Sequence, residues 1–348
     1  MADGLPGAGV QRRADPTTSH DGPIYVAGLD RSGKTTLAAY LTSHPDISIP
    51  AVGSNMWTYF YGQYGDLADA DNLERCLDAM LHYKHVRFLE PEPERIRREL
   101  AQGPATYARL FSLFLIHHAE RTGKPRWGAQ TGLVERYADR LFVAYPGLRI
   151  VHMLRDPRDR YHASVTKWPN QRGRAGGAAA RWQYSTTLAE RHARRYPDAY
   201  RIFRYEDLVH DTERTLREVC AFVGAPFTRD MLRMDGQPTL RRKLEESGGS
   251  GTDLLSPRFI GAYRDGVAPD ELAFLQAALC RRMRAHGYTL DRDLLAPRAR
   301  LRFALVSWPN QAARQLAWRG VEELQQRLPR LVGRTPAPRM RVDVPIGG

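Results

Sequence analysis

The chain has 348 residues, of which 42% are hydrophobic and 26% are charged, and its net charge is +13. This length suits one large α/β domain with additions or two small domains, and the share of charged residues is ordinary for a globular protein. No apolar run approaches the ~20 residues that a membrane-spanning helix needs. The basic excess favours an anionic ligand or surface, and no helix-turn-helix or RNA-binding motif indicates a nucleic-acid partner.

The first 22 residues lack the apolar stretch of a secretory signal, and they predict a disordered leader. We therefore expect a cytoplasmic protein that is at most peripheral to a membrane. The three cysteines, Cys76, Cys220 and Cys280, lie far apart in apolar helical patterns. This spacing favours buried free thiols over a disulfide framework or a metal site.

Apolar β-branched runs alternate with amphipathic stretches through the middle of the chain. The runs predict strands at 24–27, 148–154 and 200–205. The amphipathic stretches predict helices at about 34–43, 71–88, 94–121 and 212–223. Such alternation predicts an α/β fold with a P-loop-like, mostly parallel sheet and helices on both faces. Ligands of such sheets bind beyond the carboxyl ends of the strands.

Other segments have less regular patterns. Residues 51–70 are aromatic and Gly-rich and predict an irregular loop, while 171–180 and 245–256 are Gly-rich and predict mobile segments. Beyond residue 297, apolar residues recur at helical spacing among many arginines. This basic tail forms either a surface helix that contacts an anionic membrane or a partner, or a helix that packs on its own domain.

The segment GLDRSGKTT follows the first predicted strand and opens the first predicted helix. From Gly28 to Thr35 it matches the Walker A pattern, and from Arg31 it also matches R-S-G-x-T, a phosphosulfate loop. Unpaired N–H groups at a helix start bind anions; Arg31 and Lys34 add charge, while Thr35 and Thr36 add hydroxyl donors. The loop alone leaves ATP and an activated sulfate open.

A second group of polar residues follows the strand at 148–154. Arg155 ends that strand, and Ser164 lies on the next predicted helix, so the two offer a guanidinium fork and a hydroxyl to an anion. Two anion sites at one sheet edge fit a nucleotide that is phosphorylated at both ends. Alternatively, Asp156 holds magnesium as in a kinase, or Arg155 and Asp156 form a local salt bridge.

Four stretches carry a resemblance to a known family: DRSGKTTLAAYLTSHPDI, RIVHMLRDPRDRYHAS, FRYEDLVHDTERTLREVCAFVGAPF and SPRFIGAYRDGVAPDELAFLQAALCRRMRAHGY. In this order, over about residues 22–290, the chain resembles the sulfotransferases that use 3′-phosphoadenosine 5′-phosphosulfate (PAPS). The resemblance implies an enzyme that moves a sulfuryl group from PAPS to a hydroxyl of a carbohydrate, glycolipid or small metabolite, without a metal. It implies a sulfotransferase domain at 23–292 and a basic helical extension at 293–348.

The resemblance also implies roles for single residues. Arg31 takes the position of the residue that steadies the leaving phosphosulfate, together with Lys34. The residues that would cradle the 5′-phosphate are Ser32, Gly33, Lys34, Thr35 and Thr36. Arg155 and Ser164 would hold the 3′-phosphate, and Arg258 would close over the nucleotide. Most relatives have Thr or a small residue at the position of Lys34, so a P-loop kinase that uses ATP and magnesium stays an alternative.

The general base is not evident, because the Glu and His positions that relatives use hold other residues here. Glu135 lies close to the end of the predicted strand in RWGAQTGLVERY and is our candidate. The other candidates are His117, His118 and Asp66. Because the family's base is missing, a non-catalytic nucleotide-binding protein is a second alternative. The aromatic run 56–64 either lines an acceptor pocket or forms a core cluster.

Overall fold

A computed structural model of the chain describes residues 22–246 and 255–327. At its centre lies one five-stranded sheet with the order β2-β3-β1-β4-β5, in which all paired strands are parallel. The strands are β1 (Ile24–Ala27), β2 (Ile47–Ser48), β3 (Arg126–Gln130), β4 (Arg149–Leu154) and β5 (Tyr200–Arg204). Val26 of β1 pairs with Gln130 of β3 and with Val151 of β4. The carboxyl ends of the three central strands therefore meet at one edge of the sheet.

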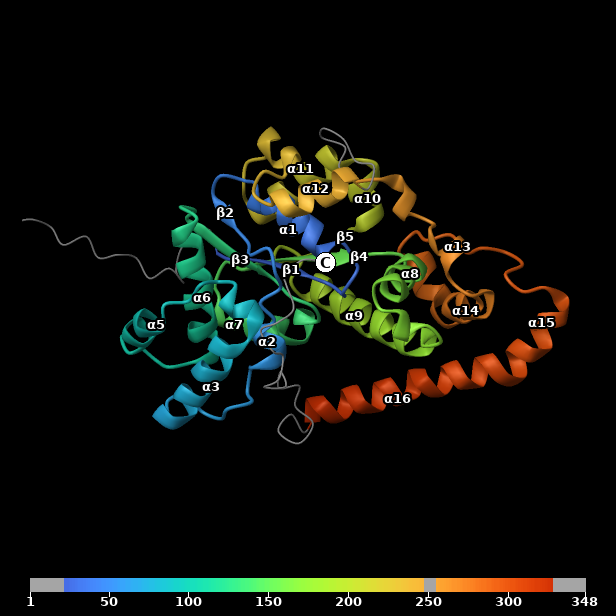
Figure 1. Cartoon of the computed structure of the whole chain (residues 1–348), viewed down its shortest axis with the longest axis horizontal. Coiled ribbons are helices and arrows are strands. Elements are labelled where there is room, and N and C mark those ends of the chain that lie inside the picture. Colours follow the sequence, from blue (N-terminus) through green and yellow to red (C-terminus); the bar gives the residue numbers. More distant parts are fainter. Residues whose placement is uncertain (1–21, 247–254, 328–348) are drawn as a thin grey trace, which may run out of the picture.

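Helices cover both faces of the sheet, as the alternating pattern predicts (Figure 1). One face carries α1 (Lys34–Thr42), α10 (Tyr205–His210), α11 (Thr212–Val223) and α12 (Pro238–Glu246). The other face carries α6 (Tyr107–Arg121), α7 (Ala138–Ala144) and α9 (Ala175–Arg195). Beside α6 and α7 lie α2 (Met56–Tyr59), α3 (Ala70–His82) and α5 (Pro93–Leu100), and α4 (Lys84–Arg87) follows α3 in the chain. Beyond β4 lie α8 (Pro157–Lys167), α13 (Tyr263–Gly266), α14 (Pro269–Ala285) and α15 (Pro297–Arg302).

The alternation of side chains along β1 divides the core. Ile24 and Val26 pack with apolar residues of α1 and α11, whereas Tyr25 and Ala27 pack in the opposite cluster with residues of α3 and α6. All four residues of β1 are buried. Successive strand residues point to opposite faces, so a parallel strand that is covered on both faces reads as a continuous apolar run.

The last described helix, α16 (Trp308–Arg327), follows a π-helical turn at Phe303–Ser307 and runs along α9 (Figure 1). The backbone N–H of Gly176 donates to Gln311 Oε1 over 2.8 Å. Arg136 and Glu322 form an ion pair in which both side chains are at most 9% exposed. The basic tail therefore packs on its own domain along its inner side.

The structure differs from the sequence predictions in several elements. The helix expected at 71–88 is divided into α3 and α4, and that expected at 94–121 into α5 and α6. The 51–70 segment includes the short helix α2, and the two-residue strand β2 was not predicted. The expectation of a mobile 171–180 segment is wrong from Ala175 onward, because α9 begins there and packs against α16.

Other expectations are confirmed or fall outside the described residues. Cys76 and Cys220 are buried free thiols, and Cys280 is a partly buried one. The predicted leader, except Gly22, and most of the 245–256 segment lie outside the described residues. Among the helices that the structure describes, none has both the length and the apolarity that crossing a bilayer requires.

Candidate functional site

The loop between β1 and α1 has the backbone of an anion cradle. Arg31 and Gly33 have left-handed φ angles of 68° and 93°, and no side chain caps the start of α1. The first N–H groups of α1 therefore stay available to an anion. A Cβ on Gly33 would lie 2.4 Å from the Tyr205 ring, so only glycine fits there. The buried Ser32 hydroxyl has no hydrogen-bond partner among the described residues, which fits a ligand oxygen at this point.

Lys34 lies at the first position of α1, with its side chain turned toward the end of β3. Its Nζ is 3.4 Å from Asp30 Oδ1 and would lie 3.5 Å from a Cβ on Gly132. The ammonium lowers the pKa of the Asp30 carboxyl. Thr35 is exposed and donates from Oγ1 to Gln130 Oε1 over 3.0 Å, while Thr36 is half-buried. The loop, α1 and the end of β3 thus form one polar surface.

Arg155 at the end of β4 contacts this loop directly. Its Nη1 donates to the Arg31 carbonyl over 3.2 Å, and its Nη2 donates to the Phe259 carbonyl over 2.8 Å. Its guanidinium lies 4.4 Å from the Tyr205 ring centroid, and its buried Nε has no partner in the described part of the chain. Arg258 is exposed beside Phe259. The structure therefore brings Arg31, Arg155 and the segment of Arg258 together.

Ser164 does not join this group. Asp159 of α8 accepts from the N–H groups of Gly261 and Tyr263 over 2.7 and 3.1 Å, so that side of α8 faces the closing segment. Ser164 follows Asp159 by five residues, which is about 140° around the helix. Its hydroxyl donates to the Arg160 carbonyl over 3.0 Å and lines a separate cavity. Its role as a 3′-phosphate ligand stays a prediction.

Asp156, the carboxylate that a kinase would use for magnesium, is already engaged. Its Oδ1 accepts from the backbone N–H and Nε of Arg158 over 2.8 and 3.0 Å, and its Oδ2 accepts from Nη2 over 2.7 Å. Both side chains are almost fully buried. Within residues 22–246 and 255–327, no group of three or more His, Cys, Asp or Glu residues is arranged to hold a metal. Asp156 therefore caps α8 and orders Arg158.

Glu135, the candidate base, lies in a closed environment. It is fully buried against α9, where the Ser185 hydroxyl donates to Oε1, and burial raises the pKa of its carboxyl. Its Oε2 has no partner within the described chain. The charge of Lys34 acts on Glu135 in the opposite direction and lowers its pKa. Glu135 is thus a buried acid close to the loop, but it is not at the surface of a cleft.

The other candidate bases serve structural contacts. His117 is buried in α6, and its Nε2 lies 2.9 Å from Glu99 Oε2. His118 lies on the same helix, where burial lowers its pKa. Asp66 is exposed and accepts from the N–H of Ala68 over 3.0 Å. None of these contacts involves the loop.

The aromatic run 56–64 packs mainly into the core. Trp57 is buried and stacks on Tyr61 at 4.8 Å, and its ring also contacts Phe111 and Tyr145. Of the two alternatives from the sequence, these contacts favour the core cluster.

Two charged residues at the loop have no predicted role from the sequence. Asp30 belongs to the loop itself, and Arg160 lies in the segment that carries Arg155 and Ser164. Arg160 and Ser164 are four residues apart, so helical spacing puts them on one face of α8. That spacing could have assigned Ser164 to the side of Arg160 and away from Arg155.

Comparison with known proteins decides the family. A sequence profile of the sulfotransferase family matches residues 23–229, which is more than half of the chain. The chain belongs to the sulfotransferase family. It is therefore an enzyme of sulfuryl transfer, and PAPS is its donor, as the four stretches imply. No curated protein matches the chain.

One solved sulfotransferase domain shares the fold of this chain, and two further solved sulfotransferases are more weakly similar to it. The sulfotransferase domain from the Synechococcus PCC 7002 olefin synthase is 18% identical, with a TM-score of 0.53 over 77% of this chain and 95% of that domain. The mouse sulfotransferase SULT7A1 complexed with PAP is 14% identical, with a TM-score of 0.43 over 77% of this chain and 85% of that one. The Mycobacterium avium sulfotransferase STF9 is 14% identical, with a TM-score of 0.45 over 78% of this chain and 79% of that one.

Proposed function

We propose that this sulfotransferase binds PAPS on the loop between β1 and α1 and transfers its sulfuryl group to a hydroxyl. The observation that carries the proposal is the buried Ser32 hydroxyl, which has no partner in the described chain and lies between the left-handed residues Arg31 and Gly33. An oxyanion would satisfy both the hydroxyl and the N–H groups at the start of α1. The residues proposed for the 5′-phosphosulfate are Arg31, Ser32, Gly33, Lys34, Thr35 and Thr36.

The 3′-phosphate is proposed to lie near Arg155. The Nε of Arg155 is buried and unpaired within the described residues, although the other two nitrogens of its guanidinium donate to carbonyls. The exposed Arg258 next to Phe259 is proposed to close over the nucleotide. Ser164 stays in the proposal on the resemblance alone.

The reaction forms a bond between the acceptor oxygen and sulfur and breaks the bond from sulfur to the bridging phosphate oxygen, which keeps the electron pair. Arg31 and Lys34 are proposed to stabilise the charge that develops on that oxygen. The acceptor proton passes to a base, for which we propose Glu135. Asp30 is the competing carboxylate, because it is 67% exposed and belongs to the loop.

The proposed acceptor is a carbohydrate, a glycolipid or a small metabolite. A lipid-linked acceptor agrees with the outer side of the tail, where Leu301, Leu305 and Leu316 are 69%, 69% and 66% exposed. Exposed apolar residues beside arginines favour contact with an anionic membrane surface. We expect sedimentation with phosphatidylserine vesicles but not with phosphatidylcholine vesicles. Leu316→Glu should abolish this sedimentation, whereas the control Val143→Glu, at a position that is 84% exposed and outside the tail, should not.

Thermal unfolding tests the donor site. A ligand that binds only the folded state stabilises it, by ~2.7 kcal/mol at a hundred times its Kd. We expect 3′-phosphoadenosine 5′-phosphate (PAP) to raise the Tm of the wild type without magnesium. This shift should be lost in Arg155→Ala and kept in Arg292→Ala, an exposed arginine that is not among the residues proposed for the donor. A shift with magnesium-ATP alone, indifferent to Arg155, would contradict the proposal.

A further inference from the structure

A cavity of about 600 Å³ opens beside the loop, between α8, α9 and α16. The loop contributes Asp30 to its wall, and α8 contributes Arg160 and Ser164. Arg174 precedes α9, Arg181 lies on α9, and Arg314 comes from α16. A larger hollow of about 890 Å³ lies along α14, but none of the residues proposed here for the donor lines it. The smaller cavity therefore adjoins the site of reaction.

The cavity is positively charged. It has four arginines and a single carboxylate, Asp30, which is already paired with Lys34. Arg160 is only 5% exposed, and its Nε has no partner among the described residues. Burial lowers the pKa of Arg160 to about 10, so its guanidinium stays charged at neutral pH. A buried, incompletely paired guanidinium in a cavity of like charges favours an anionic ligand.

The cavity also offers aromatic surface. Trp168 is 41% exposed at its wall, and Trp318 of α16 lines it from the other side. Indole rings provide flat apolar contacts for a ring or another apolar group. The lining thus suits a ligand that combines an anionic group with an apolar or aromatic part.

Two neighbouring residues of the loop contact different surroundings. The Arg31 carbonyl is held by Arg155, beside Tyr205 and Phe259, whereas Asp30 lines the arginine-rich cavity. If the nucleotide lies near Arg155, a molecule in the cavity approaches the same loop from the side of Asp30. In-line transfer needs donor and acceptor on opposite sides of the sulfur.

We propose that this cavity binds the acceptor, and that the acceptor carries its own phosphate, sulfate or carboxylate group next to an apolar or aromatic part. The inference rests on the proposed function and deepens it by naming the acceptor class. It also gives α16 a role, because Arg314 and Trp318 form the wall opposite α8.

Calorimetric titration tests the proposal with two para-substituted phenols, 4-hydroxyphenyl phosphate and the uncharged 4-methylphenol. Protein saturated with PAP is expected to bind the phosphate at least about tenfold more tightly, because a charge-assisted hydrogen bond supplies that factor or more. Arg314→Gln should weaken the binding of 4-hydroxyphenyl phosphate about tenfold. Arg319→Gln, which is exposed on the same helix and does not line the cavity, should leave it within about twofold.

The arms of this experiment separate the possible failures. If wild type does not bind PAP, the proposed function fails. If PAP binds and the two phenols bind alike, or neither binds at millimolar concentration, the anionic-acceptor proposal is overturned while sulfuryl transfer stands. If Arg314→Gln weakens PAP itself, the cavity holds the nucleotide, as the predicted role of Ser164 implies, and the proposal is again overturned.

Discussion

The contacts of Asp156 distinguish the two functional alternatives, a magnesium-dependent kinase, which would need this carboxylate for the metal, and a metal-independent transferase, which would not. Arg158 occupies both carboxylate oxygens of Asp156. We therefore expect EDTA to leave PAP binding unchanged. Asp156→Asn should cost about 1–3 kcal/mol of unfolding free energy, because it removes one of the two carboxylates that pair with the buried Arg158 guanidinium and leaves Asp291, 3.0 Å away, as the other. Urea unfolding measures this loss, with the exposed Asp198→Asn as control. Magnesium-dependent nucleotide binding that disappears in Asp156→Asn would contradict the assignment.

Glu135 gives a prediction with a defined pH dependence. Burial raises the pKa of this carboxyl above its ordinary value of 4.5. The folded chain thus holds the proton more tightly than the unfolded chain, so the ionised carboxylate costs stability as the pH rises above 4.5 toward the folded pKa. Glu135→Gln should therefore gain stability relative to wild type as the pH rises above about 4.5 toward the folded pKa, by at most about 1.4 kcal/mol per pH unit.

Urea unfolding at each pH measures this difference, and Glu94→Gln on the exposed side of α5 is the matched control. A difference that is flat with pH would contradict the raised pKa. Kinetics give the second readout. If Glu135 is the base, Glu135→Gln should lower kcat by about 10²- to 10⁴-fold with PAP affinity unchanged, and Asp30→Asn should not. The reverse result would transfer the role to Asp30.

Among the helices, the contact between α9 and α16 depends on one glycine. A Cβ on Gly176 would lie 1.9 Å from the Gln311 carbonyl oxygen, whereas a Cβ on Gly177 would meet no atom within 4 Å. Gly176→Ala should push the helices apart and cost about 1–3 kcal/mol. Gly177→Ala should be neutral or stabilise by up to about 1 kcal/mol through helix propensity. Thermal unfolding compares the two, and equal effects would contradict close packing of the helices.

The contact between α9 and α16 shows why part of the fold could not be predicted from the sequence. The runs at 24–27 and 148–154 and the helix at 212–223 follow from local patterns, and the structure confirms them with small shifts at their ends. Local propensity predicts a loop at the Gly-rich start of α9. The requirement for glycine there comes from a close contact with Gln311, which lies far along the chain. Burial of Glu135 likewise depends on Ser185 of α9. Non-local contacts thus account for these errors.

Within the candidate site, sequence patterns located the loop and Arg155, which the structure places in contact. They did not locate the cavity, since its walls come from α8, α9 and α16. The sequence motif places Ser164 nine residues after Arg155, but it does not show in which direction the Ser164 side chain points. Helical phase, and then tertiary packing, decides that direction.

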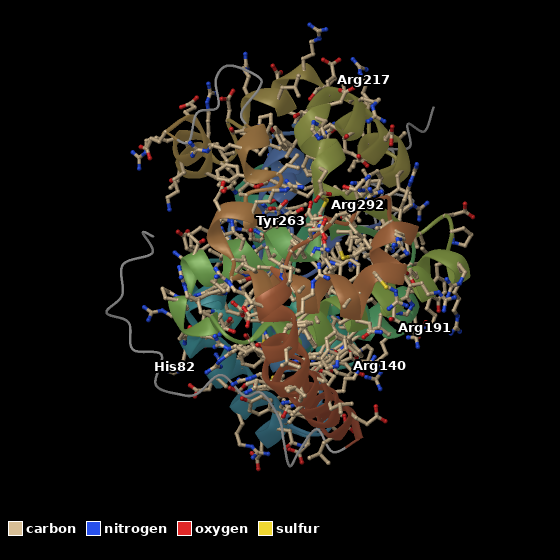
Figure 2. The ribbon with its side chains drawn as sticks, turned by 90° about the vertical axis from the view of Figure 1, so that its right-hand side faces the viewer. His82, Arg140, Arg191, Arg217, Tyr263 and Arg292 are labelled. Carbon is tan, nitrogen blue, oxygen red and sulfur yellow. The ribbon has the colours of Figure 1, made fainter. Side chains whose placement is uncertain are left out.

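At the scale of the whole molecule, the net charge of +13 gives a prediction about salt. Arginines project from the surface around the fold, among them Arg140, Arg191 and Arg217 (Figure 2). Such a field attracts a bisphosphate and is screened as the Debye length falls from ~10 Å at 0.1 M to ~3 Å at 1 M salt. PAP affinity should fall about tenfold between these salt concentrations in calorimetric titration, and that of uncharged adenosine should not. An equal response of both ligands would contradict electrostatic attraction.

The helix α16 lies outside the part of the chain that matches the family. The donor loop, Arg155 and α8 all lie within residues 23–229, the part that matches the family, whereas α16 lies beyond it. One wall of the proposed acceptor cavity therefore lies outside the matched segment, as does Arg258, which is proposed to close over the nucleotide. On the acceptor proposal, we expect substitutions confined to the final helix to change which molecules are sulfated and to leave PAP binding unchanged. Replacement of this helix is thus the design that the proposed acceptor site suggests for changing the sulfated molecule.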